Sequence, residues 1–197
     1  MEKIKWGIIG PGNIANNFAD GLKGSYSGQL VSIASKSEDR RKNFGDKYDI
    51  HPDFRFDSYE DIINSEHIDA IYISTPHTLH AQWTIKAAGK GKHILCEKPG
   101  AINFNEGKKI IDAVREAGVF YMEGFMYRCH PQIPKLVDII KNKIIGDVIS
   151  VETSFGFDMG KTIPDHRLFN KNLAGGGILD VGPVSYTHLT LPTTIEV

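Results

Sequence analysis

A glycine-rich turn between an apolar segment and a helical repeat is the feature that most limits the fold of this chain. The apolar segment from Ile4 to Ile9 is typical of a buried strand. Apolar residues then recur every four positions, which puts them on one face of a helix: Ile14, Phe18 and Leu22. A strand, a glycine turn and a helix in this order predict the first unit of a Rossmann fold.

The turn itself, Gly10-Pro11-Gly12-Asn13-Ile14-Ala15, has the GxGxxA spacing that suits the pyrophosphate of a dinucleotide. Gly10 permits the tight turn, Gly12 lets a phosphate approach the backbone, and Ala15 lets helix and strand pack closely. The helix begins near Asn13 and Ile14, where free N–H groups and the positive end of the helix dipole face the phosphates. The alternative interpretation is a glycine turn without a ligand.

The tip of the second predicted strand favours NADP over NAD. An acidic residue at this tip would hold the ribose 2′-hydroxyl of NAD. The sequence instead has Ser35 and Lys36, with Arg40 and Arg41 one helical turn further, and no carboxylate before Glu38. Cationic groups suit the 2′-phosphate of NADP. The alternative is an ordinary basic helix start that faces solvent.

The remaining segments up to residue 123 alternate between strands and helices. The predicted strands are 30–35, 70–74, 93–96 and 119–122. The predicted helices are 38–47, a short helix from Ser58, 77–90, and a helix from Asn103 with Ile110, Ile111 and Val114 on its core face. Such alternation predicts an α/β domain with a parallel sheet covered on both faces.

The pattern changes after about Gly124. A predicted helix over 131–143 precedes an alternating strand from Asp147 to Phe157, which is typical of a second, sheet-based domain. We therefore predict a Rossmann domain over 1–123 and part of a second domain over 124–182.

Composition excludes several classes of protein. The 197 residues carry a formal net charge of −1, which gives no basis for a nucleic-acid or membrane-surface partner. The two cysteines, Cys96 and Cys129, have neither disulfide-scaffold nor metal-ligand spacing, so we expect no metal site and a reducing compartment. No apolar run approaches the ~20 residues needed to span a bilayer, and no signal-peptide pattern is present, so we expect a cytoplasmic protein.

Two groups of candidate site residues follow predicted strands. Thr75, Pro76 and His77 come after the third strand, with His80 within one helical turn, and ligands bind at such strand ends. His80 has two interpretations, a contact to cofactor or substrate, or a histidine satisfied by the backbone. Glu97 and Lys98 follow the fourth strand.

Lys98 is the candidate for proton transfer. A lysine that leaves a buried strand toward the crevice can exchange a proton with an alcohol during hydride transfer. Glu97 can orient Lys98 or contact the nicotinamide ribose. The alternative is a surface lysine without a role in catalysis.

Two further candidates lie in the second predicted domain. Arg128 precedes a predicted helix with a proline in its first turn. One interpretation is that Arg128 lines a ligand site, and the alternative is that it belongs to a hinge. Asp180 follows the flexible loop Gly175-Gly176-Gly177 and begins a predicted helix. Asp180 can order a water, a substrate hydroxyl or Lys98, or can be an ordinary helix-start aspartate.

Five strings along the chain together resemble the glucose–fructose oxidoreductase/inositol dehydrogenase/MocA (Gfo/Idh/MocA) family: GIIGPGNIA, YISTPHTLH, HILCEKP, EGFMYRCHPQ and GGGILDVG. They occur in the family's order over residues 4–182, and EKP is the most specific. The MYRxHPQ string is most similar to the branch with NADP-dependent xylose dehydrogenases and dimeric dihydrodiol dehydrogenases.

The resemblance implies a Rossmann domain followed by a domain with an open antiparallel sheet. It implies that Lys98 is the catalytic-site lysine and that Asp180 belongs to the active-site motif. It further implies that a set of residues borders the cofactor: Thr75, Pro76, His80, Glu97 and Arg128. An NAD(P)-dependent oxidoreductase of a sugar or cyclic diol, homo-oligomeric at full length, is expected.

The sequence departs from the family after Gly182. Members typically have a Tyr or His four residues after the aspartate, whereas Val184 stands there in this chain. We expect residues 183–197 to be a non-native tail without a helix and the gene to be truncated, which would make this chain an inactive fragment. A non-catalytic dinucleotide sensor is the alternative from another class, although it would need neither Lys98 nor Asp180.

Overall fold

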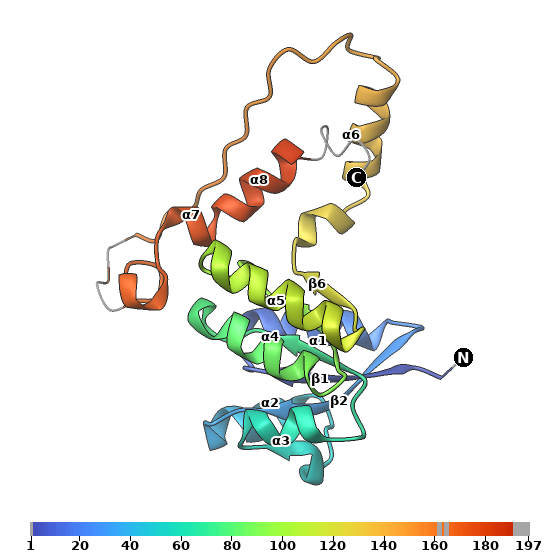
Figure 1. Cartoon of the computed structure of the whole chain (residues 1–197), viewed down its shortest axis with the longest axis vertical. Coiled ribbons are helices and arrows are strands. Elements are labelled where there is room, and N and C mark those ends of the chain that lie inside the picture. Colours follow the sequence, from blue (N-terminus) through green and yellow to red (C-terminus); the bar gives the residue numbers. More distant parts are fainter. Residues whose placement is uncertain (1, 161–162, 164–165, 191–197) are drawn as a thin grey trace. The chain divides into compact units, whose positions relative to one another are not determined.

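A computed structural model of the chain describes residues 2–160, 163 and 166–190 (Figure 1). The chain divides into two compact units, Met1–Glu123 and Gly124–Val197, and each is treated separately below. No helix in these described ranges is both long enough and apolar enough to cross a membrane.

The first unit contains a six-stranded parallel sheet in the order β3-β2-β1-β4-β5-β6. The strands are β1 (Ile4–Ile9), β2 (Gly28–Ala34), β3 (Arg55–Phe56), β4 (Ala70–Ile73), β5 (His93–Cys96) and β6 (Tyr121–Glu123). The order reverses between β1 and β4, and dinucleotides bind at such a switch point in doubly wound sheets. The predicted α/β Rossmann fold is confirmed.

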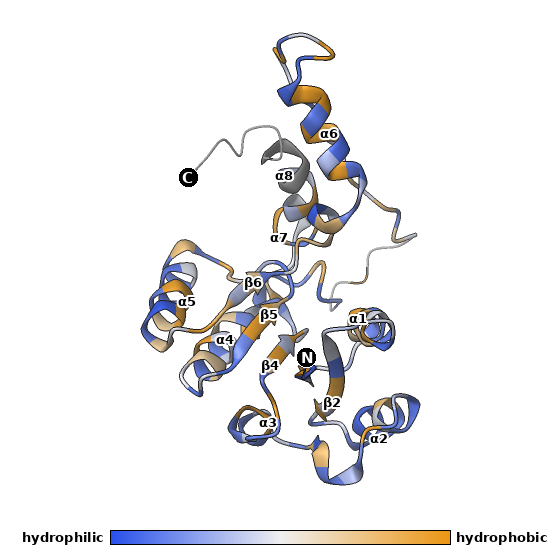
Figure 2. Cartoon of the chain, turned by 90° about the vertical axis from the view of Figure 1, so that its right-hand side faces the viewer, coloured by the Kyte–Doolittle hydropathy of each residue, from blue (hydrophilic) through white to orange (hydrophobic). Residues whose placement is uncertain are grey.

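Helices cover both faces of this sheet. They are α1 (Asn13–Lys23), α2 (Glu38–Lys47), α3 (Tyr59–Asn64), α4 (His80–Ala88) and α5 (Phe104–Ala117), with short 3₁₀ segments η1 (Pro52–Phe54) and η2 (His77–Leu79). Neighbouring strand residues face opposite cores. Ile8 packs with Ala15 and Phe44 of α1 and α2, whereas Ile9 packs with Ile62 and Trp83 of α3 and α4. Figure 2 shows apolar colour along β4 and β5, as expected for strands buried on both faces.

Side-chain caps start three of these helices. Ser37 accepts from the Arg40 amide at the start of α2, Ser58 from the Glu60 and Asp61 amides at α3, and Asn103 from the Glu106 amide at α5. Each cap satisfies N–H groups that the helix leaves without a partner. The helix starts predicted at Ser58 and Asn103 are therefore confirmed.

Three details of the first unit differ from the sequence expectations. The short strand β3 was not predicted, because two residues are too few to show a pattern. The segment predicted as one helix over 77–90 begins as the 3₁₀ turn η2 and continues as α4. Ile111 is 40% exposed, so the core face of α5 consists of Ile110 with the partly buried Ala113 and Val114.

The second unit is helical in its described residues. Its elements are η3 (Met126–Cys129), α6 (Gln132–Lys141), η4 (Lys171–Leu173), α7 (Gly177–Asp180) and α8 (Gly182–Thr190). The strand expected from Asp147 to Phe157 is wrong, because no described part of this unit supplies a neighbouring strand to pair with it. Val151, Phe155 and Phe157 are partly exposed, as an unpaired apolar segment requires.

The tail also differs from expectation. Residues 183–190 belong to α8, so the expected absence of a helix there is wrong, and residues 191–197 lie outside the described residues. The helix lacks an apolar period, but Val184 is buried and the Thr153 hydroxyl donates to the Ser185 carbonyl at 3.2 Å. Whether this segment is native stays a prediction.

Candidate active site

Three loops meet at the carboxyl edge of the sheet in the first unit. They follow β1, β4 and β5, which are adjacent and parallel, so their ends lie side by side. Ser74 joins two of them, because its amide donates to the Ile9 carbonyl at 3.0 Å and its hydroxyl to the Gly10 carbonyl at 2.8 Å. The Glu97 amide donates to the Ile73 carbonyl at 2.9 Å and ties the third loop to this edge.

Gly10 is required by its contact with the β4 loop. Its φ of +89° is a conformation that side-chain-bearing residues rarely adopt. A Cβ at this position would lie 3.0 Å from the Ser74 carbonyl oxygen and 3.1 Å from the Thr75 nitrogen. The glycine therefore lets the first loop lie directly against the end of β4.

Gly12 has a different surrounding, which leaves room for a ligand. It precedes α1 as the N-cap residue and makes no side-chain cap. A Cβ at Gly12 would meet no atom of the described residues within 4 Å. The following amides, those of Asn13 and Ile14, lie in the first helical turn, where N–H groups lack helical partners. This open, positively polarised turn fits a pyrophosphate.

Thr75 supplies a second sign of a bound group. Its side chain is 7% exposed, and its hydroxyl oxygen has no hydrogen-bond partner within the described ranges. An unpartnered buried hydroxyl is costly, so a partner from a ligand is expected here. Pro76 next to it is exposed and begins η2, while His77 is buried with its ring centroid 5.8 Å from that of His80.

His80 is occupied by the backbone. Its ring is 1% exposed, with Nδ1 2.8 Å from the Pro99 carbonyl oxygen and Nε2 2.7 Å from the Thr75 carbonyl oxygen. Of the two interpretations that the sequence left open, these contacts support a histidine satisfied by the backbone. The ring therefore links the β4 loop to the β5 loop rather than offering a nitrogen to a ligand.

The tip of β2 presents a small cationic group. Ser35 is buried, and its hydroxyl accepts from the Ser37 amide. Lys36 and Arg40 are exposed, and Lys36 Nζ lies 5.9 Å from the Tyr59 ring centroid. Burial raises the pKa of Tyr59, and the nearby Arg40 charge opposes this shift.

Arg41 stabilises the backbone turn at this tip. Its guanidinium donates to the Ser35 carbonyl at 2.7 Å, so this charge closes the turn that carries Lys36. Lys36 and Arg40 remain as the exposed cations at the tip.

Lys98 lies on the half-buried loop after β5, and its peptide bond to Pro99 is cis. Glu97 before it accepts a hydrogen bond from the Tyr72 hydroxyl at 2.5 Å. Burial raises the pKa of Tyr72 well above its usual range, and the Glu97 charge adds to this shift, so the phenol is a firm donor. The Glu97 carboxylate is thereby oriented within the same loop as Lys98.

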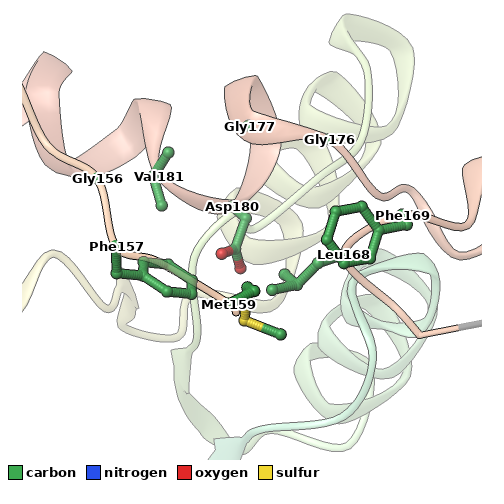
Figure 3. A pocket seen from close by; sticks show the side chains of 9 residues that line it. All are labelled: Gly156, Phe157, Met159, Leu168, Phe169, Gly176, Gly177, Asp180 and Val181. Carbon is green, nitrogen blue, oxygen red and sulfur yellow. The ribbon is translucent and has the colours of Figure 1, made fainter. Parts of the chain in front are cut away.

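Asp180 ends α7 in the second unit, with 7% of the residue exposed. Arg167 Nη1 lies 3.0 Å from its Oδ1 and forms an ion pair. Asp180 lines a pocket of about 180 Å³ together with Phe157, Met159, Leu168 and Phe169 among others. Figure 3 shows the carboxylate directed into this mostly apolar pocket, where its hydrogen bonds are poorly screened by water.

The triple glycine before α7 is held by hydrogen bonds and is not the flexible loop expected from sequence. The Gly175 amide donates to the Asn170 carbonyl, and the Gly176 amide to the Leu168 carbonyl. A Cβ on Gly175 would lie 2.6 Å from the Arg167 carbonyl oxygen, and Gly176 has a φ of +119°. These glycines bring the start of α7 against the turn that carries Arg167, and so bring Asp180 to its ion-pair partner.

Several contributors were missed by sequence reasoning. Tyr72 is the only residue of β4 that carries a polar group on its side chain. This hydroxyl in an otherwise apolar strand was the signal from which its role could have been predicted. Glu123 and Arg167 are charged residues that look like ordinary surface positions in the sequence. Arg128, by contrast, was predicted to border the cofactor. It lies exposed in η3 of the second unit, and its role at the cofactor stays a prediction.

The sheet order, the open glycine turn at its switch point and the unpartnered Thr75 hydroxyl define a dinucleotide-binding Rossmann protein. The family model for Gfo/Idh/MocA, described as an oxidoreductase family with an NAD-binding Rossmann fold, matches residues 4–125. The chain belongs to this family.

Similar proteins extend the comparison to most of the chain. A trans-1,2-dihydrobenzene-1,2-diol dehydrogenase of Xenopus tropicalis is 34% identical over 95% of this chain and 56% of its own length. A D-xylose 1-dehydrogenase (NADP(+)) of Haloferax volcanii is 34% identical over 96% of this chain and 58% of its own. The structure of an aldose-aldose oxidoreductase from Caulobacter crescentus, 28% identical, superposes with a TM-score of 0.90 over 99% of this chain and 59% of its own. The chain thus spans little more than half the length of these relatives.

Proposed function

We propose that the full-length protein is an NADP-preferring dehydrogenase that oxidises a hydroxyl-bearing carbon of a sugar or cyclic diol. The observation that carries this proposal is the position of Lys98 on the loop after β5, at the same sheet edge as the open glycine turn. This chain covers 56% of the length of the first relative named above. The proposal therefore concerns the full-length protein.

The residues of this chain would hold the cofactor at defined places. The glycine turn and the first amides of α1 would take the pyrophosphate, the Thr75 hydroxyl would gain a partner, and Lys36 with Arg40 would face the 2′-phosphate. When bound, the nicotinamide cofactor accepts or returns the hydride of the reaction. Lys98 accepts the proton that must leave the alcohol as the carbonyl forms.

Asp180 is the second residue that we assign to catalysis. The support is its buried carboxylate, which faces an apolar pocket and is paired with Arg167. A carboxylate in such surroundings binds a substrate hydroxyl strongly, because little water competes for it. Substitution of Asp180 by Asn in the intact enzyme tests this role through the KM of the sugar or diol.

Cofactor preference gives the first prediction. We expect this chain to bind NADPH about tenfold or more tightly than NADH, since a charge-assisted phosphate contact contributes about 1.5–3 kcal/mol. Lys36→Asp should remove or reverse the preference. The measurement is titration of both cofactors, followed by quenching of the fluorescence of Trp6 and Trp83.

Lys42→Asp is the matched control for this titration. Lys42 is an exposed cation of the same helix α2, so its replacement changes the net charge equally without touching the β2 tip. Equal affinities for the two cofactors in the unmodified chain would contradict the NADP assignment. An equal loss with Lys42→Asp would show that only overall charge matters.

A homo-oligomer at full length and a cytoplasmic location belong to the same proposal. The homo-oligomer is what the family resemblance implies, and the cytoplasmic location stays a prediction. Size-exclusion chromatography with light scattering on the intact enzyme tests the first, and a monomeric mass would contradict it.

A further inference from the structure

The loop that carries Lys98 is held by side chains from elements on both sides of it. His80 of α4 contacts the Pro99 carbonyl at 2.8 Å, and Glu123 of β6 accepts from the Gly100 amide at 2.7 Å. We propose that His80 and Glu123 are positioning residues that fix the loop backbone beyond Lys98 and thereby direct its side chain. The inference rests on the proton-transfer role proposed for Lys98.

Hydrogen bonds hold the loop backbone on both sides of Lys98. On the preceding side, the Glu97 amide donates to the Ile73 carbonyl in continuation of the sheet. On the following side the sheet ladder has ended, and the two residues directly after Lys98 are held by His80 and Glu123. Further along the same loop, the Ile102 amide donates to the Glu106 carboxylate at 3.2 Å.

His80 connects this loop to the cofactor side of the site. Its second ring nitrogen lies 2.7 Å from the Thr75 carbonyl, so one buried ring spans the loops after β4 and β5. Since both partners are carbonyl acceptors, a ring nitrogen contributes a bond only when it carries a hydrogen. A neutral ring carries one N–H and donates to one of these carbonyls, whereas leucine cannot donate to either, so His80→Leu would remove the hydrogen bond that the ring makes.

Glu123 is partly buried, which strengthens the hydrogen bond that its carboxylate accepts from the Gly100 amide. Burial raises the pKa of this carboxyl, while the Gly100 amide and the His80 charge oppose the shift and the Glu97 charge adds to it. The position of Gly100 is equally restricted, because a Cβ there would overlap the Tyr121 hydroxyl and approach the Glu123 carboxyl. A larger residue at position 100 would therefore have to displace the ends of the Tyr121 and Glu123 side chains.

Accurate placement of the lysine is the functional reason for such anchoring. The lysine side chain has four rotatable bonds, so its ammonium group is directed only if the backbone that bears it is fixed. A displacement of a catalytic group by about 1 Å can cost about 10²-fold in rate. The anchors therefore act on turnover through Lys98, without contact to substrate or cofactor.

Amide hydrogen exchange at Gly100, measured by NMR on this chain, tests the Glu123 anchor. Glu123→Leu removes the acceptor, and we expect the Gly100 amide to exchange at least about tenfold faster. Glu123→Gln keeps an acceptor oxygen and should stay within about twofold of the unmodified chain. An unprotected Gly100 amide in the unmodified chain would overturn the anchor without any variant, even if Glu123→Leu failed to fold.

Competitive acetylation with peptide mass spectrometry tests the link to Lys98. We expect His80→Leu and Glu123→Leu to change the acetylation rate of Lys98 severalfold, while exposed Lys90 and Lys109 keep theirs. Glu123→Gln should restore part or all of the rate. An unchanged Lys98 rate in both leucine variants would overturn the proposal.

Turnover of the intact enzyme completes the test. Glu123→Leu should lower kcat with the KM for NADPH nearly unchanged, and Glu123→Gln should recover activity. A structural role alone would predict lower stability with an unaltered rate per folded molecule, and that result would overturn the positioning role. If Lys98→Ala itself left turnover intact, the proposed function would fail, while the exchange data would still decide the anchoring.

Discussion

Replacement of Lys98 by alanine in the intact enzyme is expected to lower kcat by about 10²–10⁴, the range for loss of a general acid–base group. The reason is that the hydroxyl proton of the substrate then has no acceptor on the β5 loop. Steady-state kinetics with a sugar or diol as substrate measure the effect. The affinity for NADPH should change little, because the phosphates bind at the glycine turn and the β2 tip.

Lys90→Ala is the matched control for this experiment. Lys90 is an exposed lysine of the first unit, between α4 and β5, and lies at the opposite end of β5 from Lys98. Near-normal turnover in Lys98→Ala would mean that Lys98 has only a structural role. A comparable loss in Lys90→Ala would mean that the assay responds to general surface charge.

A pair of glycine substitutions should separate cofactor binding from folding. Gly12→Ala puts a methyl group into the open space of the turn, and we expect NADPH affinity to fall about tenfold or more through loss of a charge-assisted contact. Stability should fall by no more than about 1 kcal/mol, since only the N-cap preference changes.

Gly10→Ala is expected to act mainly on stability. Its positive φ costs a non-glycine residue about 1–2 kcal/mol, and the contact with the Ser74 and Thr75 backbone adds about 1–3 kcal/mol of overpacking. Urea unfolding and NADPH titration of both variants provide the measurements. Full NADPH affinity in Gly12→Ala would contradict the location of the pyrophosphate, and an unchanged unfolding midpoint in Gly10→Ala would contradict the described turn.

Sequence patterns were sufficient where one local signal decides the structure. Glu38–Lys47 and His93–Cys96 were predicted with the bounds that α2 and β5 have, because a capped polar helix and a short apolar run are both local features. The fingerprint at Gly10 and Gly12 located the switch point of the sheet, because βαβ units leave few alternatives for chain order.

Patterns failed where the outcome depends on a partner that lies far along the chain. Asp147 to Phe157 alternates like a strand, but a strand needs a neighbour that the described second unit does not provide. His80 could not be assigned from sequence, since its two carbonyl partners follow different strands. The ion pair of Asp180 depended on a tight glycine turn whose geometry the letters Gly-Gly-Gly do not reveal.

The position of Glu123 has a practical consequence for anyone who shortens this protein. Glu123 is the last residue of the first unit and also the acceptor for the Gly100 amide. A cut directly after it would create a charged, mobile carboxyl terminus beside the very side chain that holds the loop after β5. An isolated nucleotide-binding module should therefore keep at least Gly124 and Phe125, so that fraying begins beyond the last strand and spares the lysine loop.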